Sequence, residues 1–489
     1  MKTEELLKTN DFYDKHKNDW EFYQAAYQGT KALIEWGVLR QFEDDIDNFN
    51  ARKAAAFGFN YTKRITNIVT DFLREIPFVE EFGILKEDGL WELFANDCDL
   101  YGTNWNNFWG RKRRWVSVYG HCGILVDKAV KNDSEIETVK DEIERGIYPY
   151  LAYYSPLHIL DWRFERNEVT NRPTLVYLKL FENGDIVRIW TQENWEVWKL
   201  PEKGSEDVPE LIKTGANPFM REGAADGGKI PFVWFGNGQD AGEAWTSISD
   251  VADIAMIDAS MVRDASNADE IITNAAFPML ALPKEEITEG GENTPVEVGP
   301  LRILEFPPGS PGDKPFWLDS KTRDSIDAIL KMWEKKSEEM YGIANLSAIK
   351  EMTRSKTGRS GESLKESFRF LNAILAEKVD SEIEARLLCI KYWLMWQKME
   401  NEFKNISVSH EKKFNAEKLM LNIEDAIKAK DVVTSELFRV EVEKLVAKRI
   451  LSGLTNDQMI EMEKEIQENV PKIKENALKI KKDMPGDED

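Results

Sequence analysis

The residues whose chemistry stands out most are three basic side chains in a short segment, TRSKTGRSGES (residues 353–363). Arg354, Lys356 and Arg359 occur there without an acidic residue until Glu362, and two glycines give the backbone freedom. The whole chain carries a formal net charge of −23. Because phosphate affinity comes from neutralising basic groups, so acidic a protein is suited to transient contact with nucleic acid. The simpler interpretation of the segment is a polar connection between helices.

Motifs for catalysis or nucleotide hydrolysis do not occur in the sequence. There is no G-x-x-x-x-G-K-[ST], no G-x-S-x-G and no H-E-x-x-H. His121 and Cys122 are adjacent in GHCG, but neighbours on a strand point to opposite faces and cannot form a base–nucleophile pair. The acidic run EDDIDN (residues 43–48) lacks the glycine and the distal glutamate of a calcium loop. We therefore predict no enzymatic activity, no cofactor and no metal.

The densest basic run is WGRKRRW (residues 109–115), whose tryptophans could stack on bases. Its aromatic residues recur with Phe108 and Tyr119 at helical spacing, which favours a place in the core. On this interpretation the arginines are surface charges or partners for the surplus acids. Nucleic-acid contact at this run is the less favoured alternative.

Composition places the chain among folded, non-membrane proteins. It has 489 residues, 42% of them hydrophobic, and 16 tryptophans, which is enough for a substantial core. No apolar run reaches the length of a membrane helix, and the polar N-terminus lacks the apolar region of a signal peptide. Cys98, Cys122 and Cys389 are scattered and form no C-x-x-C pair, so we expect reduced thiols in a cytosolic place of folding.

The first half of the chain reads as helices followed by strands. Helical spacing covers most of the first 120 residues. From about residue 120 the pattern changes to β-rich runs, and Asn183-Gly184 between two of them predicts a hairpin. A glycine- and charge-rich loop is expected over 201–228, followed by a strand in KIPFVWFGN (residues 229–237). These features predict an α+β domain.

The second half is mainly helical. A helix rich in alanine and serine, over 243–277, is expected to pack closely against its neighbours. Eight of the 18 prolines lie between 278 and 318, which indicates a small β excursion with rigid loops. A second helix is predicted over 320–342. A third is predicted over 362–400, with Ser363 and Glu366 as a capping box and an apolar stripe every three or four residues.

The order of these segments resembles the portal proteins of tailed bacteriophages. The similarity spans roughly residues 50–465, and it lies in KRRWVSVYGHCGILVD, YYSPLHILDW, KIPFVWFGN, SDVADIAMIDASMVRDASNADEIITNAAFPMLAL and SGESLKESF, in this order. Each motif alone is weak, and their succession along the chain makes the resemblance.

The resemblance implies a mainly α, α+β portal architecture with the following parts: 1–242 an α/β wing, 243–277 a first stem helix, 278–319 a small β clip, 320–343 a second stem helix, 344–361 a tunnel loop, 362–413 the long wing helix and a following strand, and 414–489 a helical crown with an acidic tail. By the same resemblance, Lys350, Arg354, Lys356 and Arg359 would contact DNA from the tunnel loop.

Portal proteins of this family form rings, usually of twelve subunits, at a capsid vertex of the virion, after assembly in the host cytoplasm. Double-stranded DNA is packaged and ejected through the ring. The expected partners are further copies of the chain, the terminase large subunit, the head–tail adaptor, and the major capsid and scaffolding proteins. The alternatives are another capsid or head–tail adaptor protein and, less favoured, a DNA-processing enzyme without recognisable motifs.

Overall fold

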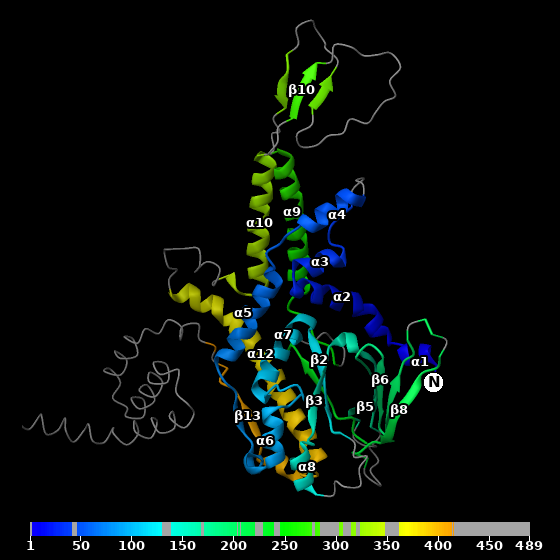
Figure 1. The fold of residues 1–489 in the computed structure, drawn as a ribbon. Helices are drawn as coiled ribbons and strands as arrows, with labels where there is room; N and C mark the ends of the chain where they lie inside the picture. The colour runs from blue at the N-terminus through cyan, green and yellow to red at the C-terminus, as the bar shows by residue number, and fades with distance from the viewer. Residues whose placement is uncertain are drawn as a thin grey trace, which may run out of the picture. The chain divides into compact units, whose positions relative to one another are not determined.

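The structure is a computed structural model (Figure 1), and it describes residues 2–41, 46–129, 138–167, 171–202, 204–205, 207–220, 228–238, 245–275, 279–283, 303–306, 314–318, 323–347, 361–412 and 414. All of them belong to one compact unit, Met1–Phe414. Helices and sheets are mixed within this unit, as the predicted α+β class requires.

Helices lead the chain, as the sequence predicts. They are α1 (Thr3–Leu7), α2 (Asp11–Gln28), α3 (Thr30–Trp36), α4 (Ile46–Ala55) and α5 (Tyr61–Glu75). At the start of α2 the side chain of Asn10 accepts a hydrogen bond from the backbone N–H of Tyr13, at 2.7 Å. Asn60 does the same for α5, accepting from the N–H of Lys63 at 3.0 Å. Both side chains satisfy donors that a helix start otherwise leaves free.

Tryptophans form the centre of the largest core. Helices α6 (Gly89–Asn96) and α7 (Trp105–Tyr119) enclose it together with the long helix α12 (Gly361–Trp396). Trp91 meets Trp393 edge to face at 5.1 Å, and Trp105 meets Trp109 at 5.3 Å. Such pairs stabilise beyond their buried area. The core therefore fixes the C-terminal half of α12 against the first hundred residues of the chain.

A three-stranded antiparallel sheet, in the order β3-β2-β9, lies against this core. Its strands are β2 (His121–Asp127), β3 (Tyr150–Tyr154) and β9 (Phe232–Gly236), and the short helix α8 (Val139–Arg145) connects β2 to β3. Gly123 of β2 faces Trp234 across the ladder. A Cβ atom at Gly123 would lie 2.0 Å from the ring of Phe232, so only glycine allows this close packing.

A second sheet has five antiparallel strands in chain order. They are β4 (Ile159–Arg166), β5 (Pro173–Glu182), β6 (Ile186–Thr191), β7 (Asn194–Lys199) and β8 (Glu210–Ala216), and the short 3₁₀ turn η2 (Pro156–His158) precedes β4. Asn183 and Gly184 have φ values of 51° and 84°, the left-handed pair that a tight hairpin requires. The predicted hairpin between β5 and β6 is therefore confirmed.

Strand β8 corrects one expectation, because the segment 201–228 was predicted to be loop throughout. Six of the seven residues of β8 are exposed, so the strand shows no apolar alternation. It forms through backbone pairing with β7 at the edge of the sheet. Pairing with a distant neighbour is invisible to a local hydrophobic pattern.

Two helices flank a small sheet in the next part of the chain. Helix α9 (Ala252–Ala275) and helix α10 (Arg323–Ile343) lie within the predicted helical ranges, although α9 begins nine residues later than expected. Between them in sequence are β10 (Met279–Pro283), β11 (Ile303–Phe306) and β12 (Phe316–Leu318). Strand β10 is central, parallel to β11 and antiparallel to β12. The predicted β excursion is thus a mixed sheet.

Helix α12 has 36 residues and ends at Trp396, four residues earlier than predicted. It begins at Gly361, so Ser363 lies inside the helix and the predicted cap at that residue is wrong. Of the predicted stripe, Leu371, Leu375, Val379, Ile390 and Leu394 are buried, and Ile383 and Leu387 are half-buried against the same core. After the 3₁₀ turn η3 (Glu400–Asn405), β13 (Ser407–Ser409) pairs with β1 (Val79–Glu81), which the turn η1 (Gly83–Glu87) follows.

Candidate functional site

Helix α9 packs through its small side chains, as its composition predicts. Ala255 and Ala259 are buried in a cluster with Ala25 and Ala26 of α2. Val262 extends the same cluster along the helix. Alanines at such a crossing let two helix backbones approach closely.

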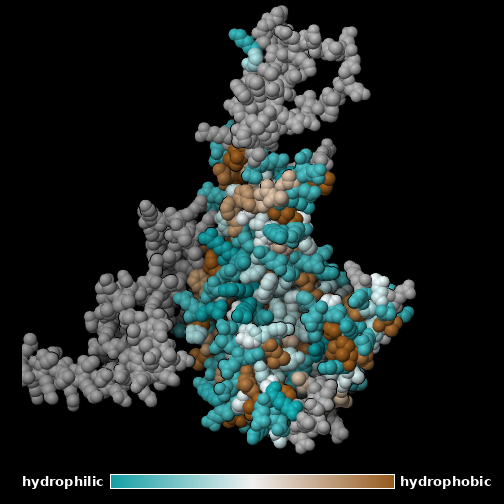
Figure 2. All heavy atoms as spheres, in the orientation of Figure 1, coloured by the Kyte–Doolittle hydropathy of each residue, from teal (hydrophilic) through white to brown (hydrophobic). Residues whose placement is uncertain are grey.

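Helix α10 pairs with α9 through a lysine. The Nζ atom of Lys336 lies 2.5 Å from Oδ2 of Asp264 and 2.5 Å from Oγ of Ser260, one turn apart on α9. Both side chains of the ion pair are about a quarter exposed, at 21% and 26%. The contact sets the register of α10 along α9 as well as contributing attraction. Figure 2 shows hydrophobic residues at the surface near the ends of these two helices.

A buried carboxylate joins α9 to α5. Asp258 Oδ2 accepts hydrogen bonds from the backbone N–H of Thr62, at 3.0 Å, and from its hydroxyl, at 2.8 Å. Burial raises the pKa of Asp258, and the two bonds from Thr62 oppose this shift. The carboxylate thus serves as a side-chain cap near the N-terminus of α5, where its charge also suits the helix dipole.

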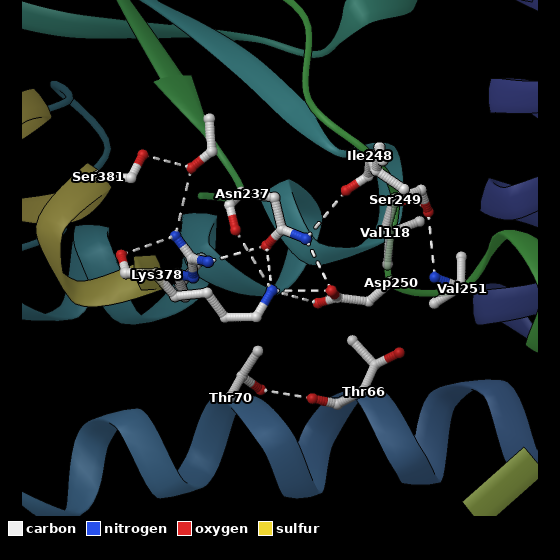
Figure 3. A network of polar contacts seen from close by, with 12 residues as sticks. Thr66, Thr70, Val118, Asn237, Ile248, Ser249, Asp250, Val251, Lys378 and Ser381 are labelled. Atoms are coloured by element: carbon white, nitrogen blue, oxygen red, sulfur yellow. Dashed lines mark hydrogen bonds and ion pairs between the residues drawn. The ribbon is translucent and has the colours of Figure 1, made fainter. Parts of the chain in front are cut away.

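The segment leading into α9 is held by a network of polar side chains (Figure 3), which we call the Lys378 network. It consists of three buried residues, Arg113, Asn237 and Lys378, and two half-buried ones, Asp250 and Ser381. Lys378 Nζ lies 2.8 Å from both oxygens of Asp250 and 2.6 Å from Oδ1 of Asn237. Arg113 donates to the same Oδ1 at 2.8 Å. Asn237 Nδ2 donates to Asp250 at 2.7 Å and to the carbonyl of Ile248 at 3.1 Å.

The network connects elements that are far apart in sequence. Arg113 comes from α7, Asn237 follows β9, Asp250 precedes α9 and Lys378 belongs to α12. Ser381, one turn beyond Lys378, donates to the carbonyl of Gly236 at 2.6 Å. The start of α9 is therefore tied to α7, to the end of a sheet strand and to α12 at one point.

Burial disfavours the charges in this network. It lowers the pKa of Lys378 to about 8, with the nearby Arg113 adding repulsion and Asp250 opposing it. Burial also lowers the pKa of Arg113, against attraction from Glu382 and Asp250. Lys378 pairs with the carboxylate of Asp250, whereas Arg113 is only attracted by it, and the neutral oxygen of Asn237 accepts a hydrogen bond from both cations.

Arg113 corrects a prediction about the run WGRKRRW. The arginines of this run were expected to be surface charges or partners for acids. Arg114 does pair with Asp71, at 2.8 Å. Arg113, in contrast, is 1% exposed and lies over the ring of Phe235 at 5.3 Å. The tryptophans of the run belong to or border the core, as predicted. Helical spacing placed the aromatic residues correctly but did not show that one arginine shares their face.

The adjacent residues His121 and Cys122 lie in different surroundings, as their alternation on β2 predicts. His121 stacks on Trp234 at 4.2 Å. Cys122 Sγ lies 2.9 Å from the hydroxyl of Tyr153. Burial lowers the pKa of His121 to about 3 and raises that of Cys122 to about 12. A neutral thiol and a weakly basic imidazole on opposite faces do not form a nucleophilic pair.

Lys350, Arg354, Lys356 and Arg359, the predicted DNA contacts, lie outside the described residues. The structure gives the helices on either side in sequence, α10 and α12, and residues 344–347 beyond α10. The acidic run 43–48 is described only from Ile46 onward, where α4 begins. The range 414–489, predicted to be a helical crown, also lies outside the description apart from Phe414.

Sequence reasoning missed the Lys378 network. A signal was present, because Lys378 falls seven residues after Leu371 and next to Val379 on the apolar stripe of α12. A lysine at a core position calls for a buried acceptor. The acceptors, Asn237 and Asp250, lie more than one hundred residues away, and no local pattern identifies them.

No helix among the described residues is long and apolar enough to cross a membrane. In the same part of the chain, no three histidine, cysteine or acidic side chains gather in a way that could hold a metal ion.

Comparisons with known proteins give distant similarity only. No protein-family profile and no curated protein matches the chain. Among solved structures, a chain of the neck of an empty gene transfer agent particle, computed with C6 symmetry, aligns over 83% of this chain and 95% of its own, with a TM-score of 0.38 and 8% identity. A chain of the native gene transfer agent virion aligns over 86% and 98%, with a TM-score of 0.41 and 10% identity. Values this low assign neither a fold nor a function.

Proposed function

We propose that this chain is a structural protein of a phage-like particle and, more specifically, its portal protein. Copies of the chain would form a ring at the capsid vertex through which double-stranded DNA is packaged and ejected. The observation that carries the proposal is the path of the chain around α9 and α10. The chain leaves the wing-like α+β part along α9, forms a small sheet, and returns along α10, which pairs with α9 through Lys336 and Asp264.

In this proposal α9 and α10 are the stem helices, and β10–β12 belong to the clip. The wing would be 1–242 together with 362–413, the tunnel loop 344–361, and the crown 414–489. The Lys378 network would then sit where the first stem helix meets the wing. A joint of this kind has to transmit force between the two parts, and four separate chain segments are hydrogen-bonded there.

The net charge of −23 suits a protein that lines a channel for DNA. Helix α9 carries five acidic side chains and one arginine, but Asp258 is buried against α5 and Asp264 pairs with Lys336, and α10 is nearly balanced with five acidic and four basic side chains. The acidity of the wall would therefore come from the chain as a whole. An acidic wall repels phosphates and so prevents the duplex from adhering during translocation. The basic side chains Lys350, Arg354, Lys356 and Arg359 would provide the limited attraction that keeps the duplex centred.

The partners follow from this role. The ring would dock the terminase large subunit during packaging and the head–tail adaptor afterwards, within a shell of major capsid and scaffolding proteins. ATP hydrolysis would belong to the terminase motor, since this chain has no phosphate-binding loop sequence. The ring number of twelve and the virion location are parts of the same proposal.

Electron microscopy of the purified full-length protein, combined with native mass spectrometry, tests the proposal. We expect rings with a central channel and a mass near twelve subunits. A monomer that also fails to form rings with its capsid and scaffolding proteins contradicts the proposal, as does a closed dimer or tetramer without a channel. The second outcome would favour a different structural role in the particle.

A further inference from the structure

A cavity of about 590 Å³ follows the outer edge of strand β3. Six consecutive residues line it, Tyr150–Ser155, because β3 is an outer strand of the three-stranded sheet and its only ladder is with β2. The lining beside this edge comes from α7 on one side, with Phe108 and Lys112, and from the β5–β6 hairpin on the other. Ligand sites in proteins commonly have this size and combine apolar surface with a few polar groups.

The backbone of Tyr153 is unpaired at this edge. Val126 donates its backbone N–H to Pro231, on the other side of β2, so Val126 and its partner Leu151 exchange no hydrogen bonds. Leu151 accordingly donates its own N–H outward, to the carbonyl of Cys98 at 2.7 Å. Tyr153, two residues further along β3, has the same orientation, and among the described residues neither its N–H nor its C=O has a partner. The edge can therefore pair with an added strand at this residue.

Lys112 places a cation beside Tyr153. Its Nζ lies 4.4 Å from the ring centroid of Tyr153 and 5.4 Å from that of Phe108. Within the described part of the chain, no oxygen atom accepts a hydrogen bond from this ammonium or forms an ion pair with it. Asp99 attracts Lys112 from a greater distance, but its Oδ1 is held by two backbone N–H groups of its own loop, at 3.1 and 3.3 Å. Burial lowers the pKa of Lys112, and the charge of Asp99 opposes this shift.

The other charged side chains of the cavity have partners within the fold. Arg188 donates from Nε to Glu182 at 2.7 Å and from Nη1 to Asp127 at 2.6 Å. Tyr154 also donates to Glu182. Burial lowers the pKa of His158, which keeps its imidazole neutral, and its Nδ1 lies 2.8 Å from the hydroxyl of Ser155. Among the described lining residues, Lys112 is thus the cation that remains for a ligand.

We propose that the outer edge of β3 binds an extended segment of a partner protein, which adds to the sheet as an antiparallel strand and places a glutamate opposite Tyr153. Residues that face each other across an antiparallel pair have their side chains on the same side of the sheet. The glutamate would therefore lie beside the ring of Tyr153, where the ammonium of Lys112 is. Its two neighbours would point to the other side of the sheet, where Tyr154 and Phe181 line the cavity. The preferred segment is thus apolar–glutamate–apolar.

Two interactions of different kinds would act together in this complex. Hydrogen bonds between the two backbones supply affinity whatever the sequence of the segment, and the side-chain contacts supply the choice of partner. A carboxylate at the central position completes the ion pair that Lys112 lacks, whereas a basic side chain there would be repelled. A nucleic acid has no strand backbone that could pair with Tyr153. This inference does not depend on the portal proposal.

Fluorescence anisotropy with the full-length protein tests the edge. The probe is the peptide fluorescein-Gly-Gly-Thr-Val-Glu-Val-Thr-amide, measured at near-physiological salt. One control peptide has glutamine in place of glutamate, and a second has N-methylglutamate, which lacks the N–H that the carbonyl of Tyr153 would accept. We expect saturable binding of the glutamate peptide with a Kd below about 1 mM. Each control should bind about tenfold more weakly, because it loses a charge-assisted or a backbone hydrogen bond.

Variants locate the binding. Lys112→Met keeps an unbranched side chain and removes its charge, so this variant should bind the glutamate and glutamine peptides equally. The matched control is Lys31→Met on α3, where the lysine side chain is 92% exposed, and it should keep the preference for glutamate. Circular dichroism shows whether both variants are folded. The comparison of the three peptides on the parent protein needs no variant.

Several results would overturn the proposal. Equal binding of the glutamate and glutamine peptides by the parent protein, or a preference that survives in Lys112→Met, removes Lys112 from the site. Unchanged binding of the N-methyl peptide removes the edge of β3. Absence of saturable binding of the glutamate peptide also contradicts the proposal. If the native mass then falls in Lys112→Met alone, a second copy of this chain is the occupant of the edge.

Discussion

Two clusters of charged side chains bind α12 to the rest of the fold, and they differ in composition: one has more cations than carboxylates, and the other has more carboxylates than cations. In the Lys378 network, two cations lie near one carboxylate, Asp250, which pairs with Lys378, and the amide oxygen of Asn237 accepts a hydrogen bond from both cations. In the second cluster, around Arg386, one cation pairs with two carboxylates. Arg386 pairs with Glu80 at 2.8 Å and with Glu382 at 2.6 Å, and its guanidinium lies 4.0 Å from the ring centroid of Phe78.

The comparison shows that each cluster is unbalanced while the two together are neutral. The clusters contain three cations (Arg113, Lys378, Arg386) and three carboxylates (Glu80, Asp250, Glu382). Lys378 and Arg386 form the ion pairs, and Arg113 is attracted by Glu382 and Asp250. Attraction from Glu382 acts on Arg113 across the two clusters. Buried charges are tolerated when each has partners, so the stability of α12 depends on the whole row.

The largest effect is expected from Arg386→Met. This change leaves Glu80 and Glu382 buried next to each other without a cation, and their side chains are only 8% and 6% exposed. The free energy of unfolding should fall by about 3–5 kcal/mol, as it does when one partner of a buried ion pair is removed. Urea denaturation measures the loss. Adding Glu382→Gln should recover part of it, and a loss below about 1 kcal/mol would contradict the proposed dependence.

Asp250→Asn should have the next largest effect. It leaves Lys378 without a carboxylate partner and Arg113 with attraction from Glu382 alone, whereas Lys378→Met leaves one cation and one carboxylate in the network. We expect a loss of about 2 kcal/mol for Asp250→Asn and about 1 kcal/mol for Lys378→Met, reduced because Asp250 is 21% exposed. The two variants are compared by the same denaturation experiment. A larger loss for Lys378→Met than for Asp250→Asn would mean that the Lys378–Asp250 ion pair, and not the excess of cations, determines the stability of this network.

Alkaline pH should act on Lys378 with a defined sign. Its pKa is lowered to about 8 in the folded protein, against 10.5 for a free lysine side chain. Between these values the unfolded chain binds one proton more, so rising pH adds stability through this residue. The difference in unfolding free energy between the parent and Lys378→Met should therefore increase by about 1–2 kcal/mol from pH 7 to 9.5.

The buried tyrosines titrate in both proteins and cancel in this difference. A difference that stays constant or decreases with pH would show that Asp250 keeps Lys378 charged in spite of its burial. The cations of both clusters would then stay ionised throughout this pH range, and the two clusters would not differ in this respect.

The smallest effect on stability is expected for the basic side chains predicted to contact DNA. Reversing the charge of Lys350, Arg354, Lys356 and Arg359 should change the free energy of unfolding by less than about 0.5 kcal/mol, because the portal proposal places them on a loop that faces the channel. Packaging efficiency and DNA retention, measured in assembled particles, should both decrease. If both are unchanged, these residues do not contact DNA.

The fold was largely predictable where local pattern and tertiary structure agree. The stripe of α12 and the Asn183-Gly184 hairpin rely on periodicity and backbone preference, which neighbouring residues determine. Strand β8 was missed because edge pairing shaped it, and Arg113 was misplaced because its acceptor Asn237 lies 124 residues further along the chain. The predicted DNA contacts remain a prediction, since they lie outside the described residues.

The pairing within the small sheet has a consequence for how this protein can change. Met279 of β10 pairs with Leu318 of β12, so the segment between α9 and α10 enters and leaves at neighbouring points. Insertions with adjacent ends disturb their host least. The forty residues from 279 to 318 can therefore be regarded as an exchangeable cassette. In the proposed portal role, replacing this cassette would change the docking partner while α9 and α10 keep their register.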